Sequence, residues 1–156
     1  FIVHGAPEHT PLIRTARGVN DSKIHHVIGR AEALIAANPA ARVACLGLAF
    51  KANIDDFRES PARLVAATLA RKFGQRITVV EPYAAELPRE FAGTGASLID
   101  LDTALEQADI LLVLVDHDQF RAVPLAERAG KLVYDTRGIW RDQPAAPPAE
   151  PLRKAG

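Results

Sequence analysis

Short, nearly continuous apolar runs recur along this sequence and alternate with segments of helical periodicity. The runs are Arg42–Leu48, Ile77–Val80, Leu98–Ile99, Ile110–Val115 and Leu132–Tyr134. Apolar runs of this kind, without polar alternation, are typical of strands that are covered on both faces. Parallel neighbours need crossover connections, and units of roughly thirty residues leave room for helical ones. The sequence therefore predicts an α/β fold built on a doubly wound parallel sheet.

Three segments carry helix signals. Apolar residues recur at intervals of three and four from Pro7 to about Ala37, which predicts a long amphipathic helix. Gly18 and the cluster Asn20–Ser22 could divide it into two helices, because these residues are weak helix formers. A second helix is expected from a Ser60 cap and Pro61 to Phe73, ended by Gly74, and a third over Asp102–Ala108.

These elements divide the chain into three parts. We expect a helical segment at 1–38, a Rossmann-like domain at 39–141, and a disordered tail at 142–156. The tail is rich in proline and alanine, with too little apolar bulk to offset the entropy of ordering. The chain begins with Phe1–Val3, which reads as the continuation of an apolar segment, so we expect a piece of a longer protein.

The composition indicates which classes of partner the protein can bind and in which cellular compartment it is expected. The chain has 19 basic and 19 acidic residues, which gives no support for nucleic-acid binding. It has one cysteine, no signal-like start, and no apolar run of about 18 residues that could span a membrane. We therefore expect a cytoplasmic protein without an internal disulfide or a membrane anchor.

The loop after the first strand offers an anion-binding site. It runs from Gly47 to Ala62 and lacks the G-x-G-x-x-G pattern, so we expect a degenerate Rossmann unit without an ordinary dinucleotide site. Phe50 supplies a flat apolar surface, Lys51 a point charge, and Arg58 a guanidinium suited to phosphate. The alternative is a solvated loop in which Lys51 and Arg58 pair with the neighbouring acids Asp55, Asp56 and Glu59.

Other polar residues follow the later strands. Arg137 follows the last strand and should face the first loop across the switch region of the sheet. Glu81 is expected to be structural rather than ribose-binding, and His117 to make loop hydrogen bonds rather than bind a metal. Cys45 lies inside an apolar strand, so a nucleophilic role is not expected. The other histidines do not match a metal-site spacing, so no metal is expected; they are His4, His9, His25 and His26. We expect no catalytic residue in this chain.

Several of these motifs together resemble the C-terminal domain of the UDP-glucose/GDP-mannose 6-dehydrogenase family. The similar segments are Cys45–Lys51, Asp55–Pro61, Glu81–Pro82 and Asp135–Arg137, and Leu12–Arg17 and Val19–Asp21 resemble the helix before the domain. Within the family, the segment Ile54–Pro61 is most similar to the UDP-N-acetylmannosamine dehydrogenase branch.

The resemblance implies a role for this chain in a larger enzyme. Members oxidise the C6 alcohol of the sugar to a carboxylate with two NAD+, through a thiohemiacetal on a cysteine. They act as homodimers, and the resemblance implies that the helical segment at 1–38 is a remnant of their central dimerisation region. It implies that Phe50, Lys51 and Arg137 contact the UDP-sugar, and that Arg58 contacts NAD held mainly by an N-terminal domain. That domain's glycine motif and the reactive cysteine are absent from this sequence, so the chain alone should be inactive. The alternatives are a stand-alone nucleotide-binding module and a purely structural interaction domain.

Overall fold

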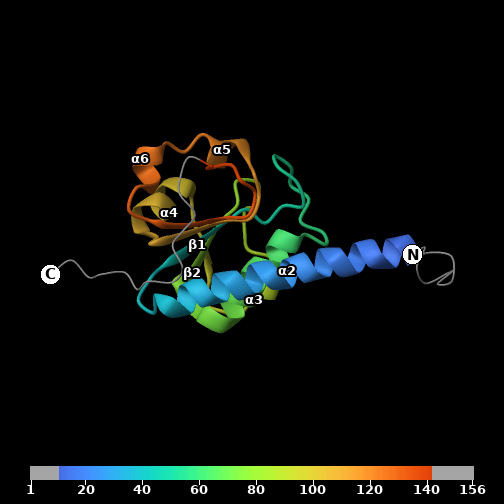
Figure 1. The fold of residues 1–156 in the computed structure, drawn as a ribbon. Coiled ribbons are helices and arrows are strands. Elements are labelled where there is room, and N and C mark those ends of the chain that lie inside the picture. The colour runs from blue at the N-terminus through green and yellow to red at the C-terminus, as the bar shows by residue number, and fades with distance from the viewer. Residues whose placement is uncertain (1–10, 142–156) are drawn as a thin grey trace.

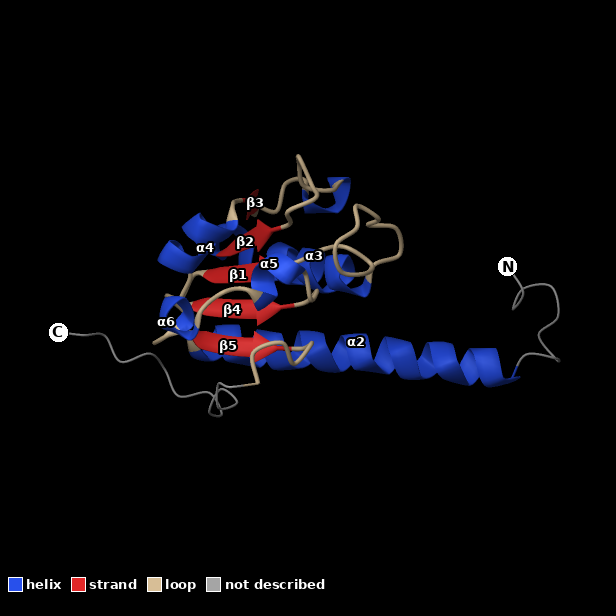
Figure 2. Ribbon diagram, turned by 90° about the horizontal axis from the view of Figure 1, so that it is seen from above, coloured by secondary structure: helices blue, strands red, loops and turns tan. Residues whose placement is uncertain are grey.

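The computed structural model describes the backbone of residues 11–141 and the side chains of residues 21–141. Its centre is a parallel sheet of five strands in the order β3-β2-β1-β4-β5 (Figure 2). The strands are β1 (Val43–Leu46), β2 (Ile77–Val80), β3 (Ser97–Leu98), β4 (Ile110–Val113) and β5 (Leu132–Asp135). Every predicted strand is present, although β1 and β4 end two residues earlier than expected.

Helices cover both faces of the sheet, which confirms the doubly wound α/β fold (Figure 1). On one face lie α2 (Pro11–Ala37) and α3 (Pro61–Phe73), and on the other α4 (Leu101–Gln107), α5 (Asp118–Arg121) and α6 (Leu125–Arg128). Two short 3-10 turns, η2 (Gly74–Arg76) and η3 (Arg89–Phe91), flank β2. Along β1, Val43 and Cys45 pack in one core and Ala44 and Leu46 in the other, so this strand is apolar throughout.

The direction of winding changes between β1 and β4. The chain places β2 and β3 on one side of β1 and then returns to place β4 and β5 on the other side. In open α/β sheets, ligands bind outside the carboxyl ends of the strands at such a switch point. The loops that follow β1 and β4 therefore lie where a binding site is expected.

The helix α3 begins and ends as its sequence predicts. The Ser60 hydroxyl accepts a hydrogen bond from the Arg63 N–H at 3.4 Å, and Pro61 occupies the first turn, where its missing N–H costs nothing. Gly74 ends the helix with φ of +61°, a conformation that glycine adopts without strain.

The helix α2 is continuous, so the break considered at Gly18 and Asn20–Ser22 is wrong. Each weak helix former costs about 1 kcal/mol or less, which the hydrogen bonds of the flanking turns outweigh. From Ile24 onward its apolar residues pack against the core, whereas its N-terminal part projects beyond the sheet (Figure 2). Residues 7–10 of the expected helix and the tail 142–156 lie outside the described residues. Among the described residues, no helix is long and apolar enough to cross a membrane.

Candidate functional site

The chain leaves β1 through a glycine at a position where a side chain would be strained. Gly47 has φ of +95°, and a Cβ atom there would lie 2.4 Å from the Cβ of Val115, two residues after β4. Its N–H donates to the carbonyl of Val80 at 2.8 Å. The loop that follows therefore starts in close contact with the carboxyl ends of both neighbouring strands.

Glu81, directly after β2, connects to the start of this loop. Its Oε2 accepts hydrogen bonds from the N–H groups of Leu48 at 2.7 Å and Ala49 at 3.1 Å, and its Oε1 accepts one from the N–H of Tyr83 at 3.1 Å. The side chain is completely buried. Burial alone would raise the pKa of Glu81, but the hydrogen bonds from His117, Leu48 and Tyr83 outweigh it and lower the pKa. The structural role expected for Glu81 is confirmed.

His117, after β4, continues this buried network. Its Nδ1 accepts a hydrogen bond from the N–H of Asn53 at 2.8 Å, and its Nε2 lies 3.2 Å from Oε2 of Glu81. Because Nδ1 accepts, the ring proton lies on Nε2 and is donated to the carboxylate. The rings of Tyr83 and Phe120 lie beside the imidazole, with centroids at 5.3 Å and 5.2 Å. The loop hydrogen bonding expected for His117 is confirmed.

Phe50 and Lys51 lie on the exposed part of the β1 loop. Phe50 leaves 51% of its surface exposed, an unusual position for a large apolar side chain, while its N–H donates to the carbonyl of Asp56 at 2.8 Å. Lys51 is exposed and its side chain forms no hydrogen bond or ion pair with another described residue. The alternative in which Lys51 pairs with the neighbouring acids is therefore not observed.

Arg58 differs from Lys51 because it is paired within its own loop. Its guanidinium forms two hydrogen bonds with the Asp56 carboxylate, each of 2.9 Å, and its side chain is 88% exposed. The side-chain hydrogen bond from Arg58 lowers the pKa of Asp56 to about 2. The alternative of a solvated loop with pairs between neighbouring charges is therefore observed for Arg58.

Arg137, in the loop after β5, turns back toward the end of β4. Asp135 holds this loop, since its carboxylate accepts hydrogen bonds from the N–H groups of Arg137 at 2.9 Å and Gly138 at 2.7 Å. The Arg137 guanidinium then contacts Oδ1 of Asp116, with its Nη2 at 3.1 Å and its Nε at 3.2 Å. Asp116 is adjacent to His117, so the loops of Lys51 and Arg137 both contact the segment that follows β4.

The sequence did not predict the two arginine partners of Asp116. It pairs with Arg121 at 2.6 Å as well as with Arg137. Burial raises the pKa of Asp116, but the hydrogen bond from Arg121 and the charge of Arg137 outweigh this and lower it. Asn53 was also missed, although its φ of +61° matches the known tolerance of asparagine for left-handed backbone.

The remaining candidates for chemistry are inert or lie elsewhere. Burial raises the pKa of the Cys45 thiol to about 12, so it is protonated at neutral pH and a poor nucleophile, as expected. No cluster of three potential metal ligands occurs among the described residues; His4 and His9 are not among these.

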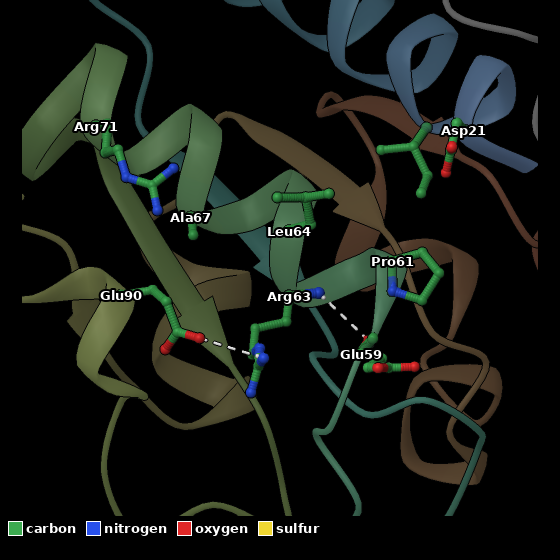
Figure 3. Close-up of a pocket in the computed structure, with 10 residues that line it drawn as sticks. Asp21, Glu59, Pro61, Arg63, Leu64, Ala67, Arg71 and Glu90 are labelled. Atoms are coloured by element: carbon green, nitrogen blue, oxygen red, sulfur yellow. Dashed lines mark hydrogen bonds and ion pairs between the residues drawn. The ribbon is translucent and has the colours of Figure 1, made fainter. Parts of the chain in front are cut away.

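A separate pocket of about 550 Å³ lies between α2 and the start of α3 (Figure 3). Its lining includes Glu59, Arg63 and Leu64, and Arg63 is paired with Glu90 at 3.2 Å. Neither Lys51 nor the residues after β4 and β5 line it. This pocket is therefore distinct from the candidate site at the carboxyl ends of β1, β4 and β5.

A known protein family matches the part of the chain that holds these loops. Residues 44–142 match the family described as "UDP-glucose/GDP-mannose dehydrogenase family, UDP binding domain". The chain belongs to this family. The matched range contains the β1 loop and the loops after β2, β4 and β5, so the whole candidate site lies within the UDP binding domain of the family.

Individual relatives are dehydrogenases of nucleotide sugars. The chain is 46% identical over 149 residues to UDP-N-acetyl-D-mannosamine dehydrogenase of Salmonella typhi, covering 90% of this chain and 35% of the relative. It is 45% identical over 140 residues to NDP-N-acetyl-D-galactosaminuronic acid dehydrogenase of Ralstonia nicotianae, with coverage of 90% and 33%. The chain thus spans about a third of the length of the curated relatives that it matches.

Solved structures of the family share the fold. A UDP-D-ManNAc dehydrogenase from Pyrococcus horikoshii superposes with a TM-score of 0.70 at 29% identity, covering 91% of this chain and 33% of that one. A UDP-glucose dehydrogenase from Pyrobaculum islandicum gives a TM-score of 0.73 at 23% identity over 96% of this chain and 33% of that one. At that lower identity the likeness concerns the fold alone.

Proposed function

We propose that this chain binds the UDP part of a nucleotide sugar within an NAD-dependent UDP-sugar 6-dehydrogenase. The observation that carries the proposal is the placement of two cations, Lys51 and Arg137, within a UDP binding domain. Lys51 has no ionic partner among the described residues, and the loops of both cations contact the segment that follows β4. A diphosphate is the ligand that two such cations suit best. The exposed ring of Phe50 would pack on the ligand, which would cover apolar surface that water now contacts.

The proposed substrate is UDP-N-acetylmannosamine, oxidised at its C6 alcohol to the uronic acid. Support comes from relatives at 43 to 46% identity that are named UDP-N-acetyl-D-mannosamine dehydrogenases. Relatives that act on an N-acetyl-D-galactosaminuronic acid compound are similarly close, at 44 to 45% identity. Both names contain an N-acetylated hexose. The relatives therefore support an N-acetylated sugar more strongly than they support its manno configuration.

The described residues of this sheet do not form a site that fits NAD. The glycine-rich turn is absent after β1, and Glu81, at the position where a ribose-binding acid would stand, is buried and fully hydrogen bonded. We propose that NAD is held by another part of the whole enzyme and that Arg58 contacts it from this chain. The high exposure of Arg58 supports this, because its pairing with Asp56 is solvated and easily exchanged.

We also propose that the whole protein is a cytoplasmic homodimer that α2 helps to form. The projection of α2 beyond the sheet supports this, because a helix that leaves its own domain has a surface available to a second subunit (Figure 1). The single cysteine supports the compartment, since a chain without disulfides has no need of an oxidising one.

Titration calorimetry with UDP tests the proposed binding. The variant Lys51→Ala/Arg137→Ala removes two charge-assisted contacts worth about 1.5–3 kcal/mol each, so UDP should bind about 100-fold or more weakly. The variant Arg42→Ala/Lys72→Ala removes the same two kinds of charge from the amino-terminal edge of the sheet and should bind UDP as the unaltered chain does. Uridine lacks phosphates, so its affinity should differ little between these two double variants.

Two results would contradict the proposal. Absence of a heat of binding at millimolar UDP would remove the evidence for a UDP site. Equal losses in both double variants would show that net charge, rather than the placement of Lys51 and Arg137, controls binding.

A further inference from the structure

We propose that His117 is a positioning residue for the nucleotide sugar, because it fixes the β1 loop through Asn53 in the conformation that presents Lys51 and Phe50. This inference rests on the proposed function, since it takes the β1 loop as part of the UDP site. His117 itself is completely buried, and so it acts on the ligand through the loop rather than by contact.

The loop depends on Asn53 for its attachment. Leu48 and Ala49 bond to Glu81 at the start of the loop, and Phe50 bonds only within the loop, to Asp56. Between Phe50 and Asp56, the described hydrogen bonds to the rest of the domain all come from Asn53. Its N–H donates to Nδ1 of His117 at 2.8 Å, and its Oδ1 accepts the N–H of Asp118 at 3.0 Å. Lys51, two residues before Asn53, is therefore placed by these two bonds.

A neutral histidine suits this task for a specific reason. A ring with one donor and one acceptor nitrogen joins an N–H group on one side to a carboxylate on the other. Glu81 accepts the Nε2 proton, fixes the tautomer, and so keeps the Nδ1 lone pair directed at Asn53. The neighbouring rings of Tyr83 and Phe120 restrict rotation of the imidazole. Glu81 thus supports the loop twice, directly at Leu48 and Ala49 and indirectly through His117.

Two amide substitutions separate the two halves of this network. In His117→Asn, the side-chain oxygen can take the place of Nδ1 and accept the Asn53 N–H, but the side chain is too short to reach Glu81. In His117→Gln, the terminal NH2 can take the place of Nε2 and donate to Glu81, but the acceptor for Asn53 is lost. Both variants remove the ring and both leave a neutral polar side chain, so each is the matched control of the other.

We expect the affinity for UDP to depend on whether the Asn53 N–H keeps its acceptor at position 117, and not on the overall stability of the variant. Calorimetry with UDP should show binding about 10-fold weaker in His117→Gln, as expected for the loss of one buried hydrogen bond that orders the loop. The variant His117→Asn should recover most of that loss. Urea unfolding of both variants should show that the two lose comparable stability. A merely structural role for His117 would instead make affinity fall in step with stability in both.

Nuclear magnetic resonance of the unaltered chain tests the geometry without a ligand. The 15N signals of His117 should show the tautomer with its proton on Nε2, and the Asn53 amide should exchange slowly with solvent. Should His117→Gln fail to fold, Asn53→Gly loosens the same attachment from the loop side. Glycine accepts the positive φ and keeps the N–H, but it loses the bond to Asp118, and UDP should bind measurably more weakly.

The outcomes separate this inference from the proposed function. A fast-exchanging Asn53 amide in the unaltered chain, or the tautomer with its proton on Nδ1, would overturn the inference. So would unaltered UDP affinity in both His117→Gln and Asn53→Gly. An unaltered chain that binds no UDP would overturn the proposed function, and with it the claim that His117 positions a nucleotide sugar.

Discussion

Replacing Glu81 with glutamine should destabilise the domain although it changes only one atom of the side chain. The carboxylate accepts hydrogen bonds from three backbone N–H groups and from His117, whereas an amide offers one acceptor oxygen and an NH2 group. If the amide oxygen takes the place of Oε2, the NH2 faces the N–H of Tyr83, and that donor loses its acceptor. A lost acceptor costs about 1–3 kcal/mol, and the other three bonds weaken because they are no longer charge-assisted.

The neutral amide also costs less to bury, which offsets part of this loss. We therefore expect Glu81→Gln to lower the free energy of unfolding by about 2–4 kcal/mol at pH 7. For a domain of this size that is a fall in Tm of about 6–12 °C.

The effect should depend on pH in a defined direction. Because the pKa of Glu81 is lowered in the folded state, its contribution is fully present above the ordinary glutamate value of 4.5. The contribution is lost as the pH falls through the lower, folded pKa. Glutamine does not titrate, so the difference in stability between the unaltered chain and Glu81→Gln should shrink below about pH 4.

Urea unfolding followed by circular dichroism, repeated from pH 7 to pH 3, measures both effects. The control is Glu106→Gln, which makes the same chemical change at an exposed site on α4 and should alter stability by less than about 0.5 kcal/mol. A loss in Glu81→Gln no larger than in this control would refute the reasoning, because it would mean that the buried carboxylate makes no net contribution. A difference that grew toward low pH would refute the direction of the pKa shift.

Three further predictions concern other residues. Gly47→Ala should lower the free energy of unfolding by about 2–5 kcal/mol, because of a positive φ and a clash with Val115. Gly29→Ala adds a methyl group in open space within a helix and should slightly raise Tm in thermal unfolding. Cys45 should not react with a thiol reagent in the native chain at pH 8 and should react once in urea; native labelling would contradict its burial. The chain mixed with UDP-N-acetylmannosamine and NAD+ should form no NADH by absorbance, because Cys45 is its only thiol; steady NADH formation would contradict this.

The sequence predicts the sheet well because buried parallel strands leave a local signal. The runs at β2 and β4 are almost wholly apolar, and they predict the first residue of both strands correctly. The apolar run predicts the carboxyl end of β1 two residues too late, because Leu48 is also fully buried although Gly47 has already turned the chain. Burial continues beyond a strand when the following loop packs on the core, and composition alone does not distinguish the two.

The candidate site was predictable in its loops but not in its contacts. Lys51 and Arg137 follow strands at one edge of a parallel sheet, which the order of elements already implies. The bond between Asn53 and His117 joins residues 64 positions apart, and the pair of Arg137 with Asp116 joins residues 21 apart. No periodicity or motif marks such pairs, because they arise only from the order in which the strands associate. The continuous α2 has a similar cause, since cooperative helix formation tolerates residues that single-residue propensities disfavour.

The position of Asp116 between two arginines affects how an anion could enter. In the proposed site, Arg137 is already oriented, so a phosphate would not have to supply the roughly 2 kcal/mol of side-chain entropy that immobilising a free arginine costs. The phosphate would take the place of one carboxylate oxygen, and Asp116 would keep Arg121 as its counter-ion. Binding would then exchange one anion for another at the Arg137 guanidinium, which is paired both before and after. UDP affinity should therefore depend less on ionic strength than it would if two unpaired cations bound the diphosphate.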